Sequence, residues 1–406
     1  LSLPITEQLD TDKAQLETSP EDITRKLDQS LKNIIEKEGL IKSNVSKKIS
    51  SANGGNFLGI LYEVDIKGKT KDKDKELNIF VKNMPDRKAF KLLSVEGVYT
   101  TELFAYKELS KIFEELQKAA NVPLKERFEM VKVYEESNAE SIIMENICKK
   151  GFTTFFRMDT VPLKFVEIAV QNLARFHGAS FALKEKRPKY FEETIKCIKY
   201  PLIFQEYWKD LVKKMRDATI EYVDEKFKDK IDKVYVDMVE KYARNFNDET
   251  IKTCLCHGDY KPNNIMTRIE NGVLQEVIAI DYQLLHYGCP VFDLIYLIYF
   301  CTDREFRKTQ MINLKNLYYE TLENYLGYFN LEVNVIYPRE DFEKVFKERL
   351  DHGLMSALFM FPFLFAPESD APDLAKGVAG HSFPVDTRFK DRIRGVIEDF
   401  VELGFM

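Results

Sequence analysis

One short segment carries a carboxylate and an amide at the spacing that phosphoryl transfer requires. Residues 257–264 read HGDYKPNN, which places Asp259 and Asn264 five positions apart. A carboxylate beside an attacking hydroxyl group can orient that group and accept its proton, and an amide oxygen on the same loop can bind a Mg²⁺ ion on a triphosphate. We therefore expect Asp259 to act as a catalytic base and Asn264 to bind Mg²⁺.

A second acidic side chain follows at the end of an apolar strand, since residues 277–281 read VIAID. Between the two segments lies Asn271-Gly272, a dipeptide typical of a tight hairpin turn. Pairing of 265–268 with 276–280 would bring Asn264 and Asp281 together at one end of that hairpin. Asp281 is therefore the expected second ligand of Mg²⁺.

Residues upstream supply the groups that would bind the rest of ATP. The spacing H-x-D-x-x-x-x-N is that of kinase catalytic loops, and in kinases a strand lysine holds the phosphates and pairs with a helix glutamate. Lys82 ends the apolar stretch IFVK, and Glu102 in the following helix is its expected partner, so both join Asp259 as expected catalytic residues. Lys82 is also an expected nucleotide-binding residue. The turn Asn53-Gly54-Gly55-Asn56 would cover the phosphates with backbone N–H groups. The backbone of Glu145 and Ile147 would face adenine.

Each of these features has a simpler explanation when it stands alone. An HGD triplet is often a turn that its aspartate side chain stabilises, and an Asn-Gly-Gly-Asn stretch fits any hairpin. Lys82 and Glu102 would each pass for a solvated surface charge. Their order and spacing along one chain together favour a kinase-like site.

The surrounding pattern predicts an α+β, bilobal, protein-kinase-like fold. Its first part is a small lobe of antiparallel strands with one key helix. Ser19-Pro20-Glu21-Asp22 is a good helix start, and Gly39 can close that leader helix. The remaining expected elements of this lobe are strands between Val45 and Met84, a helix over Val98–Gln117 with Leu103, Tyr106, Leu109 and Phe113 on one face, and short strands at Met130–Tyr134 and Ser141–Met144.

The second part is expected to be a larger, mainly helical lobe. One long amphipathic helix is predicted over Val161–Leu183, charged helices over 187–250, and further helices from Pro290 onward. We therefore divide the chain into a tail and leader helix at 1–40, an ATP-binding lobe at 41–147, and a catalytic and acceptor-binding lobe at 148–406.

Composition excludes several other classes of protein. The 406 residues are 45% hydrophobic and 31% charged, with a net charge of −6, whereas a nucleic-acid binder usually carries a basic surplus. No apolar stretch reaches the length of about 18 residues that a membrane span needs. The start of the chain lacks the features of a secretion signal, and the six cysteines are scattered, so we expect reduced thiols, a cytoplasmic protein and no obligate protein partner. Metal binding at Cys254-x-Cys256 is disfavoured, because that spacing is tighter than in the usual zinc knuckle.

The residues after Asp281 favour a small acceptor over a protein. Protein kinases carry a long segment between D-F-G and A-P-E, but here Tyr282-Gln283 follows the aspartate, and Pro290 comes only nine residues after it. Gly258 also replaces the usual arginine of H-R-D. These departures leave no room for a long peptide-docking loop.

Several stretches resemble the insect ecdysteroid kinase-like family (CHK-like kinases), which is related to choline and aminoglycoside kinases. The resemblance rests on CLCHGDYKPNNIM, IDYQLLHYGCPVFDLIYLIYF, IFVKNMP, GVYTTELFAYKEL, IIMENICKKGF, LARFHGASFAL and DRIRGVIEDFVELGF. It extends over nearly the whole chain from about residue 30.

The resemblance implies the bilobal fold, ATP and Mg²⁺ as cofactors, and phosphorylation of a hydroxyl on an ecdysteroid or on a lipophilic foreign compound in detoxification. By the same resemblance Asp259 is the base, Asn264 and Asp281 bind Mg²⁺, Lys82 and Glu102 order the phosphates, and Asp293 braces the catalytic loop. Tyr260-Lys261-Pro262 departs from the Leu-Trp pair common in the family, a difference that bears on the identity of the acceptor.

Two alternatives remain open. A choline, ethanolamine or aminoglycoside kinase would want acids and an aromatic cage around a cationic acceptor. The acids and aromatics near Trp208 are mixed with lysines, which disfavours that reading. A pseudokinase that only binds ATP or a ligand is disfavoured because all catalytic positions are filled. We expect His177 to be a core histidine with a local hydrogen bond, and the aromatic cluster Phe359–Phe365 to be core or the lining of an apolar pocket.

Overall fold

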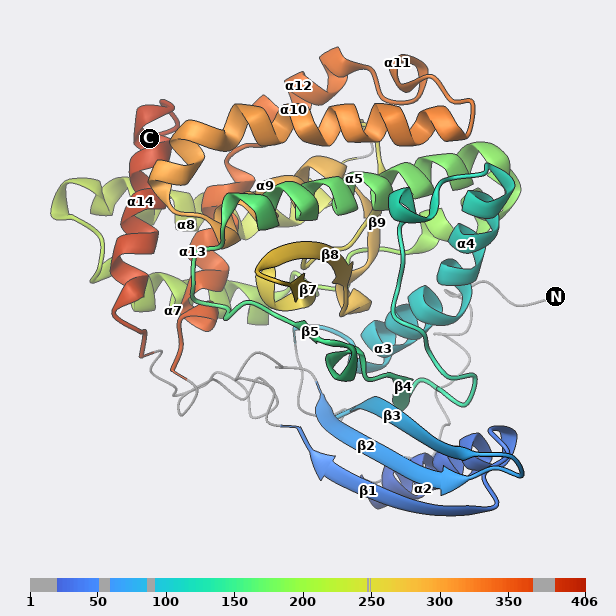
Figure 1. Cartoon of the computed structure of the whole chain (residues 1–406). Coiled ribbons are helices and arrows are strands. Elements are labelled where there is room, and N and C mark those ends of the chain that lie inside the picture. The colour runs from blue at the N-terminus through green and yellow to red at the C-terminus, as the bar shows by residue number, and fades with distance from the viewer. Residues whose placement is uncertain (1–19, 51–58, 86–91, 247, 249, 368–383) are drawn as a thin grey trace.

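The computed structural model describes residues 20–50, 59–85, 92–246, 248, 250–367 and 384–406. Within these ranges the chain forms a small lobe built on an antiparallel sheet and a larger lobe made mainly of helices (Figure 1). The predicted bilobal α+β fold class is confirmed.

A four-stranded antiparallel sheet forms the small lobe. Its strands lie in chain order: β1 (Lys42–Ile49), β2 (Ile60–Lys69), β3 (Asp74–Asn83) and β4 (Ser141–Glu145). The pairing of β1 with β2 confirms the predicted hairpin, while its turn Asn53-Gly54-Gly55-Asn56 lies outside the described residues. Lys82 pairs in register with Leu61 and Ile142, in the centre of the sheet.

The leader helix α2 (Pro20–Lys37) covers the outer face of this sheet (Figure 1). Its apolar side chains Leu27, Leu31 and Ile34 are buried against Val64, Ile66 and Ile79 of the strands. Gly39 adopts a positive φ of 70°, as expected for a residue that ends a helix. The result is a small separate core between helix and sheet.

The helix predicted over Val98–Gln117 forms, but it is not uniformly α-helical. α3 (Val95–Phe104) passes into one π-helical turn, η2 (Ala105–Leu109), before α4 (Ser110–Ala119). The wider turn shifts the faces of the helix, so that Glu102 and Tyr106 are both buried while Leu103 is only half-buried. The predicted apolar face is therefore wrong at Leu103.

The strand predicted over Met130–Tyr134 is also wrong. Only Val133 makes an isolated bridge, to Met144. The polar turn that follows folds back at once, because the Ser137 hydroxyl accepts from the N–H of Ile143 and donates to its carbonyl. Tyr134 still donates its N–H to the carbonyl of Ile143, but the N–H of Ile143, which a longer partner strand would have used, is bonded to Ser137.

The larger lobe is built around α5 (Leu163–Lys186), which packs along α10 (Arg304–Tyr328) (Figure 1). α5 confirms the helix predicted over Val161–Leu183, and every residue of α9 (Pro290–Cys301) is buried. The other helices are α6 (Pro188–Glu193), α7 (Glu206–Ile220), α8 (Lys228–Phe246), α11 (Val333–Ile336), α12 (Arg339–Glu348), α13 (His352–Leu364) and α14 (Arg388–Glu402). Short helical turns are η3 (Leu124–Glu126), η4 (Ile147–Lys150), η5 (Ile195–Cys197), η6 (Glu225–Phe227), η7 (Pro262–Asn264) and η8 (Tyr282–Leu284).

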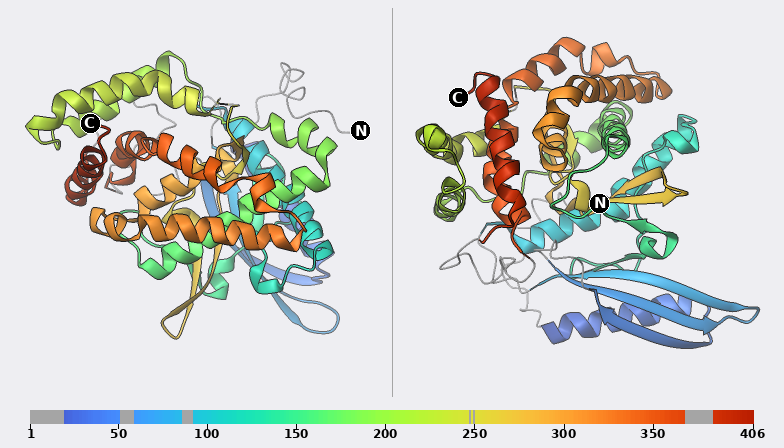
Figure 2. Two further views of the ribbon diagram at one scale, coloured as in Figure 1. Left: turned by 90° about the horizontal axis from the view of Figure 1, so that it is seen from above. Right: turned by 60° about the vertical axis from the view of Figure 1, so that its left-hand side comes forward.

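Two small antiparallel sheets carry the segments with the catalytic motif. β7 (Ile265–Glu270) and β8 (Val273–Ala279) form the predicted hairpin, extended by β5 (Phe152–Thr153), and β6 (Cys254–Cys256) pairs with β9 (His286–Gly288). Asn271 and Gly272 have φ values of 52° and 75°, as a tight hairpin turn requires. The β7–β8 and β2–β3 hairpins project toward the same side of the molecule (Figure 2).

The aromatic segment of α13 belongs to the core. Phe359, Phe361, Phe363 and Phe365 are all buried, and Phe359 packs on Trp208 with ring centroids 4.8 Å apart. Within the described ranges, none of the helices combines the length and the apolar composition that crossing a membrane requires.

The small core between α2 and the sheet yields a stability prediction. Leu27→Ala removes a side chain that is 1% exposed, so it should lower the free energy of unfolding by about 2–5 kcal/mol. Thermal or urea denaturation measures the change. Lys32→Ala, an exposed position on the same helix, is the control and should leave stability within about 0.5 kcal/mol of the parent. Equal effects of the two changes would show that α2 does not pack as described.

Candidate active site

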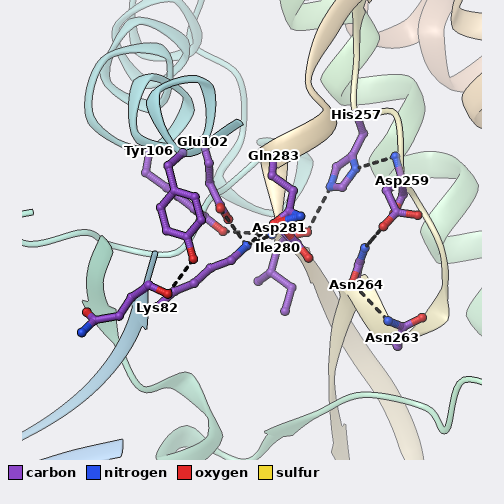
Figure 3. Close-up of polar contacts among 12 residues, drawn as sticks. Lys82, Glu102, Tyr106, His257, Asp259, Asn263, Asn264, Ile280, Asp281 and Gln283 are labelled. Atoms are coloured by element: carbon purple, nitrogen blue, oxygen red, sulfur yellow. Dashed lines mark hydrogen bonds and ion pairs between the residues drawn. The ribbon is translucent and has the colours of Figure 1, made fainter. Parts of the chain in front are cut away.

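The Lys82 ammonium connects the two lobes. Its Nζ lies 2.7 Å from Oε2 of Glu102 on α3, 2.7 Å from Oδ1 of Asp281 after β8, and 2.5 Å from Oε1 of Gln283 (Figure 3). Lys82 is 5% exposed and Glu102 is 1% exposed. The predicted pairing of Lys82 with Glu102 is thus present in the fold, and the Asp281 carboxylate completes it.

The protonation of this cluster follows from its burial and its charges. Burial works against the positive charge of Lys82, but the carboxylates of Asp281 and Glu102 outweigh it, and the pKa of Lys82 is raised above its usual value. Burial raises the pKa of Glu102 above its usual value, against the pull of the Lys82 ammonium. Lys82 therefore stays protonated at neutral pH and suits the binding of an anion.

The backbone at Asp281 is held in an unusual conformation. Its φ of 68° lies in the left-handed region that non-glycine residues seldom occupy. The hydroxyl of Tyr106 accepts a hydrogen bond from the N–H of Asp281 at 3.1 Å. Tyr106 lies in the π turn after Glu102, so one helix supports Asp281 directly through Tyr106 and supports its partner Lys82 through Glu102.

The Asp259 carboxylate is surrounded by hydrogen-bond donors. Lys261 Nζ lies 2.5 Å from each of its two oxygens, and the Tyr296 hydroxyl donates to Oδ1 at 2.8 Å. Asn264 donates from Nδ2 to Oδ2 of Asp259 at 2.8 Å and to its carbonyl at 2.9 Å. The five-residue spacing of Asp259 and Asn264 thus brings their side chains into direct contact (Figure 3).

Two buried groups hold the catalytic loop in place. Asp293 on α9 accepts from the N–H of His257 at 2.6 Å and from the N–H of Gly258 at 2.9 Å, which confirms that it braces the loop. His257 is itself buried, and burial lowers its pKa. A neutral ring fits its contacts, with Nε2 3.1 Å from the carbonyl of Ile280 and Nδ1 accepting from the N–H of Asp259 at 3.3 Å.

His177 has a longer-range role than the sequence suggests. It is a buried core histidine, but its Nε2 lies 3.2 Å from Asp293, and its Nδ1 lies 2.7 Å from the hydroxyl of Tyr318. The expected local hydrogen bond is thus replaced by contacts with two distant helices. Although burial alone would raise it, the pKa of Asp293 is lowered, chiefly by its hydrogen bond to His177.

Gly258 is required by the geometry of the loop. Its φ is 79°, and a Cβ at this position would lie 2.3 Å from the carbonyl oxygen of Leu284. A larger residue in place of this glycine would collide with the turn that follows Asp281. The absence of an arginine at this position therefore has a steric cause as well.

A cavity of about 330 Å³ lies between the lobes beside these groups. It is lined from the sheet by Leu61, Phe80 and Lys82 and from the β7–β8 hairpin by Met266, Ile280 and Asp281. At the connection between the lobes its lining residues are Met144, Asn146 and Cys148.

The predicted adenine contacts and phosphate turn stay untested. The N–H of Glu145 donates to the carbonyl of Lys132, and its carboxylate pairs with Lys150 at 2.9 Å. Ile147 is buried at the start of η4. The backbone roles of Glu145 and Ile147 toward adenine remain predictions, as does the phosphate turn 53–56.

The oxygen atoms beside the cavity suit Mg²⁺. Asp281 offers a carboxylate and Asn264 an amide oxygen, and oxygen ligands are those that Mg²⁺ prefers. The neighbouring Asn263 has a buried amide oxygen that finds no hydrogen-bond partner among the described residues. The residues predicted to bind the metal therefore form a donor set that fits it.

Sequence reasoning missed several contacts of this site. Lys261 stands inside the recognised loop, Gln283 follows Asp281 by two positions, Tyr106 follows Glu102 by four, and Tyr296 follows Asp293 by three. Each was therefore within one helical turn or a few residues of a recognised group. What was missing was the direction of the side chain, which depends on the tertiary fold.

The buried thiols make a poor metal site. The ligand atoms of His177, Cys254 and Cys256 lie within 4.8 Å of one another. Both imidazole nitrogens of His177 are engaged by Tyr318 and Asp293, and burial raises the pKa of both thiols. This agrees with the expectation of reduced, buried cysteines at these two positions.

Comparison with known proteins gives one family and several similar folds. Residues 53–331 match the ecdysteroid kinase-like family. No curated protein matches the sequence. Among solved structures, the chain is similar to an ethanolamine kinase from Plasmodium vivax, with 13% identity, 97% of each chain covered and a TM-score of 0.40. It is also similar to the GDP complex of a mutant aminoglycoside 2'-phosphotransferase-IIIa (14% identity, 94% of this chain and 97% of that chain, TM-score 0.39) and to a microcompartment-associated aminopropanol kinase (11%, 92% and 98%, 0.39).

The steric requirement at Gly258 can be tested against a second glycine. Gly258→Ala and Gly272→Ala both place a side chain at a positive φ, which costs about 1–2 kcal/mol. Only Gly258→Ala also creates a clash, since nothing lies within 4 Å of the Cβ position at Gly272. Gly258→Ala should therefore lower the melting temperature clearly more than Gly272→Ala. Equal shifts would contradict the packing of the loop on Leu284.

Proposed function

Because the chain belongs to the ecdysteroid kinase-like family, we propose that it transfers the γ-phosphate of ATP to a hydroxyl group of a lipophilic small molecule, such as an ecdysteroid or a foreign alcohol. The observation that carries the proposal is the buried Lys82 ammonium, which bonds to carboxylates from both lobes beside the cavity. A lysine in this position has the charge and the rigid support that a triphosphate requires.

ATP binds in the cavity between the lobes in this proposal. The apolar side chains of Leu61, Phe80 and Met266 suit the adenine ring, and Lys82 faces the phosphates. Asn264 and Asp281 hold Mg²⁺, which offsets the negative charge of the phosphates when it is bound. Glu102 keeps Lys82 extended toward that end of the cavity.

Asp259 is the proposed base. Its carboxylate orients the acceptor hydroxyl and takes its proton as the hydroxyl oxygen bonds to the γ-phosphorus. The bond from that phosphorus to the bridging oxygen breaks, and ADP leaves with the electron pair. Asp293 and His257 fix the loop backbone, so that the carboxylate does not have to be positioned during the reaction.

The surroundings of Asp259 favour an uncharged acceptor over a cationic one. The Lys261 ammonium contacts the Asp259 carboxylate, and a choline-like or aminoglycoside cation that binds next to these two residues would be repelled by its charge. The adjacent side chains are aromatic, since Tyr296 stacks on Phe300 with centroids 3.9 Å apart. Aromatic rings suit an apolar acceptor and a cation alike, so the preference for an uncharged acceptor rests on the charge of Lys261. Burial raises the pKa of the nearby Tyr200 and Tyr242, and the charge of Asp259 adds to this, so both rings are neutral.

A compact acceptor is also supported by the chain after Asp281. The interval before α9 is filled by η8 and by β9, which pairs with β6. Helix α9 then begins at Pro290. This short, structured connection offers no long segment on which a peptide would dock.

The function is tested by screening acceptors. Purified protein with Mg²⁺ and ATP is incubated with ecdysteroids, other steroid alcohols, choline, an aminoglycoside and casein, and products are measured by mass spectrometry. We expect a phosphorylated steroid or other lipophilic alcohol, with the rate reduced at least about 100-fold by Asp259→Asn. The exposed Asp237→Asn is the matched control and should be fully active.

The other outcomes are distinct. Transfer to choline or to the aminoglycoside would keep the mechanism and reject the lipophilic acceptor. Labelling of casein that Asp259→Asn abolishes would reject the small-molecule assignment. Nucleotide binding without transfer to any acceptor would favour a binding role.

A further inference from the structure

The Asp259 carboxylate is already fully occupied by hydrogen-bond donors. Lys261 contacts both oxygens, Tyr296 contacts Oδ1, and Asn264 contacts Oδ2. The two oxygens of a carboxylate offer about four acceptor positions, and these contacts fill them. A substrate hydroxyl can reach this base only after one of the present donors leaves.

Lys261 is the donor that can leave. Tyr296 belongs to α9, in which every residue is buried, and its ring stacks on Phe300. Asn264 is fixed by its second bond, to the carbonyl of Asp259, and by the N–H of Ile280 on its own carbonyl. Lys261 has a flexible side chain, and in the described part of the chain its ammonium is recorded in contact with Asp259 alone.

A second anion must take the place of Asp259 when Lys261 leaves. Lys261 is 6% exposed, and an unpaired ammonium at such a site is strongly unfavourable. In a productive complex the γ-phosphate lies in line with the hydroxyl that Asp259 holds, about 3–3.5 Å from it. Its oxygens then offer a second anionic partner next to the Asp259 carboxylate that Lys261 contacts.

We propose that Lys261 is a further catalytic residue. In the resting protein its ammonium blocks the Asp259 carboxylate, and when ATP binds the ammonium moves to contact the γ-phosphate. This inference rests on the proposed function. The exchange frees an Asp259 oxygen, which accepts the hydroxyl proton as the oxygen–phosphorus bond forms, while ADP departs with the electrons of the broken bond. The acceptor therefore binds after ATP, and Lys261 offsets the charge of the phosphoryl group in transfer.

The experiment compares two nucleotides that differ in the γ-phosphate. Calorimetric titration with Mg²⁺ measures the Kd of ADP and of an ATP analogue with an imido β–γ bridge. Lys261→Met should raise the Kd of the analogue about tenfold or more, because its γ-phosphate then faces the uncompensated Asp259 carboxylate. The Kd of ADP should be unchanged. Lys261→Arg should restore much of the preference, and the exposed Lys230→Met should change neither value.

The outcomes separate this inference from the proposed function. Equal changes in both Kd values, or none, would overturn the role of Lys261 and leave the kinase proposal standing, provided that a melting curve shows Lys261→Met to be folded. Failure of the parent protein to bind either nucleotide would overturn both. A second titration uses the alcohol that is phosphorylated in the screen. The alcohol should bind to the protein that holds the imido analogue but not to the protein that holds ADP. Equal binding of the alcohol in both cases would show that Lys261 does not block Asp259.

Discussion

A buried ammonium must be paired, and the pairing of Lys82 constrains most of the site. Its partners come from a helix of the small lobe and from the end of a hairpin in the large lobe, so three separate elements must meet at one nitrogen atom. An unpaired charge at this depth would cost several kcal/mol. Two unusual backbone features make these contacts possible. The left-handed backbone of Asp281 directs its carboxylate toward Lys82, and the π turn places the Tyr106 hydroxyl where it accepts the hydrogen bond from the N–H of Asp281.

The loop that carries Asp259 depends on a second buried cluster, formed by Asp293 and His177. Asp293 holds the loop through two backbone N–H groups, and His177 fixes Asp293 from helix α5. Gly258 allows the loop to pass against the turn after Asp281. The helical core therefore fixes the backbone position of Asp259, while the proposed exchange of Lys261 decides whether its carboxylate is accessible.

Much of the site was predictable because its residues obey local rules. The Asn-Gly turn fixes the β7–β8 hairpin, which brings Asn264 and Asp281 to one end, and strand alternation aims Lys82 at the cavity. The errors have physical causes that a local pattern does not contain. The apolar spacing of the helix after β3 is compatible with either an α or a π turn. The segment 130–134 has strand-forming residues, but the N–H of Ile143 that would extend its pairing with β4 is bonded to Ser137. The position of Lys261 in the sequence suggested a role in acceptor choice, whereas its side chain lies on the expected base.

The two hydrophobic cores of the molecule do not coincide with its two lobes. Helices α3 and α4 belong to the extensive core of the large lobe, whereas α2 and the outer face of the sheet form a core of their own. Glu102 thus lies on a helix of the first core, and Lys82 lies on β3, whose apolar residues Leu77, Ile79 and Val81 belong to the second. The ion pair of Lys82 and Glu102 therefore links the two cores. Any movement of the sheet relative to the helices has to stretch or break this ion pair, so the Lys82–Glu102 contact resists separation of the two cores.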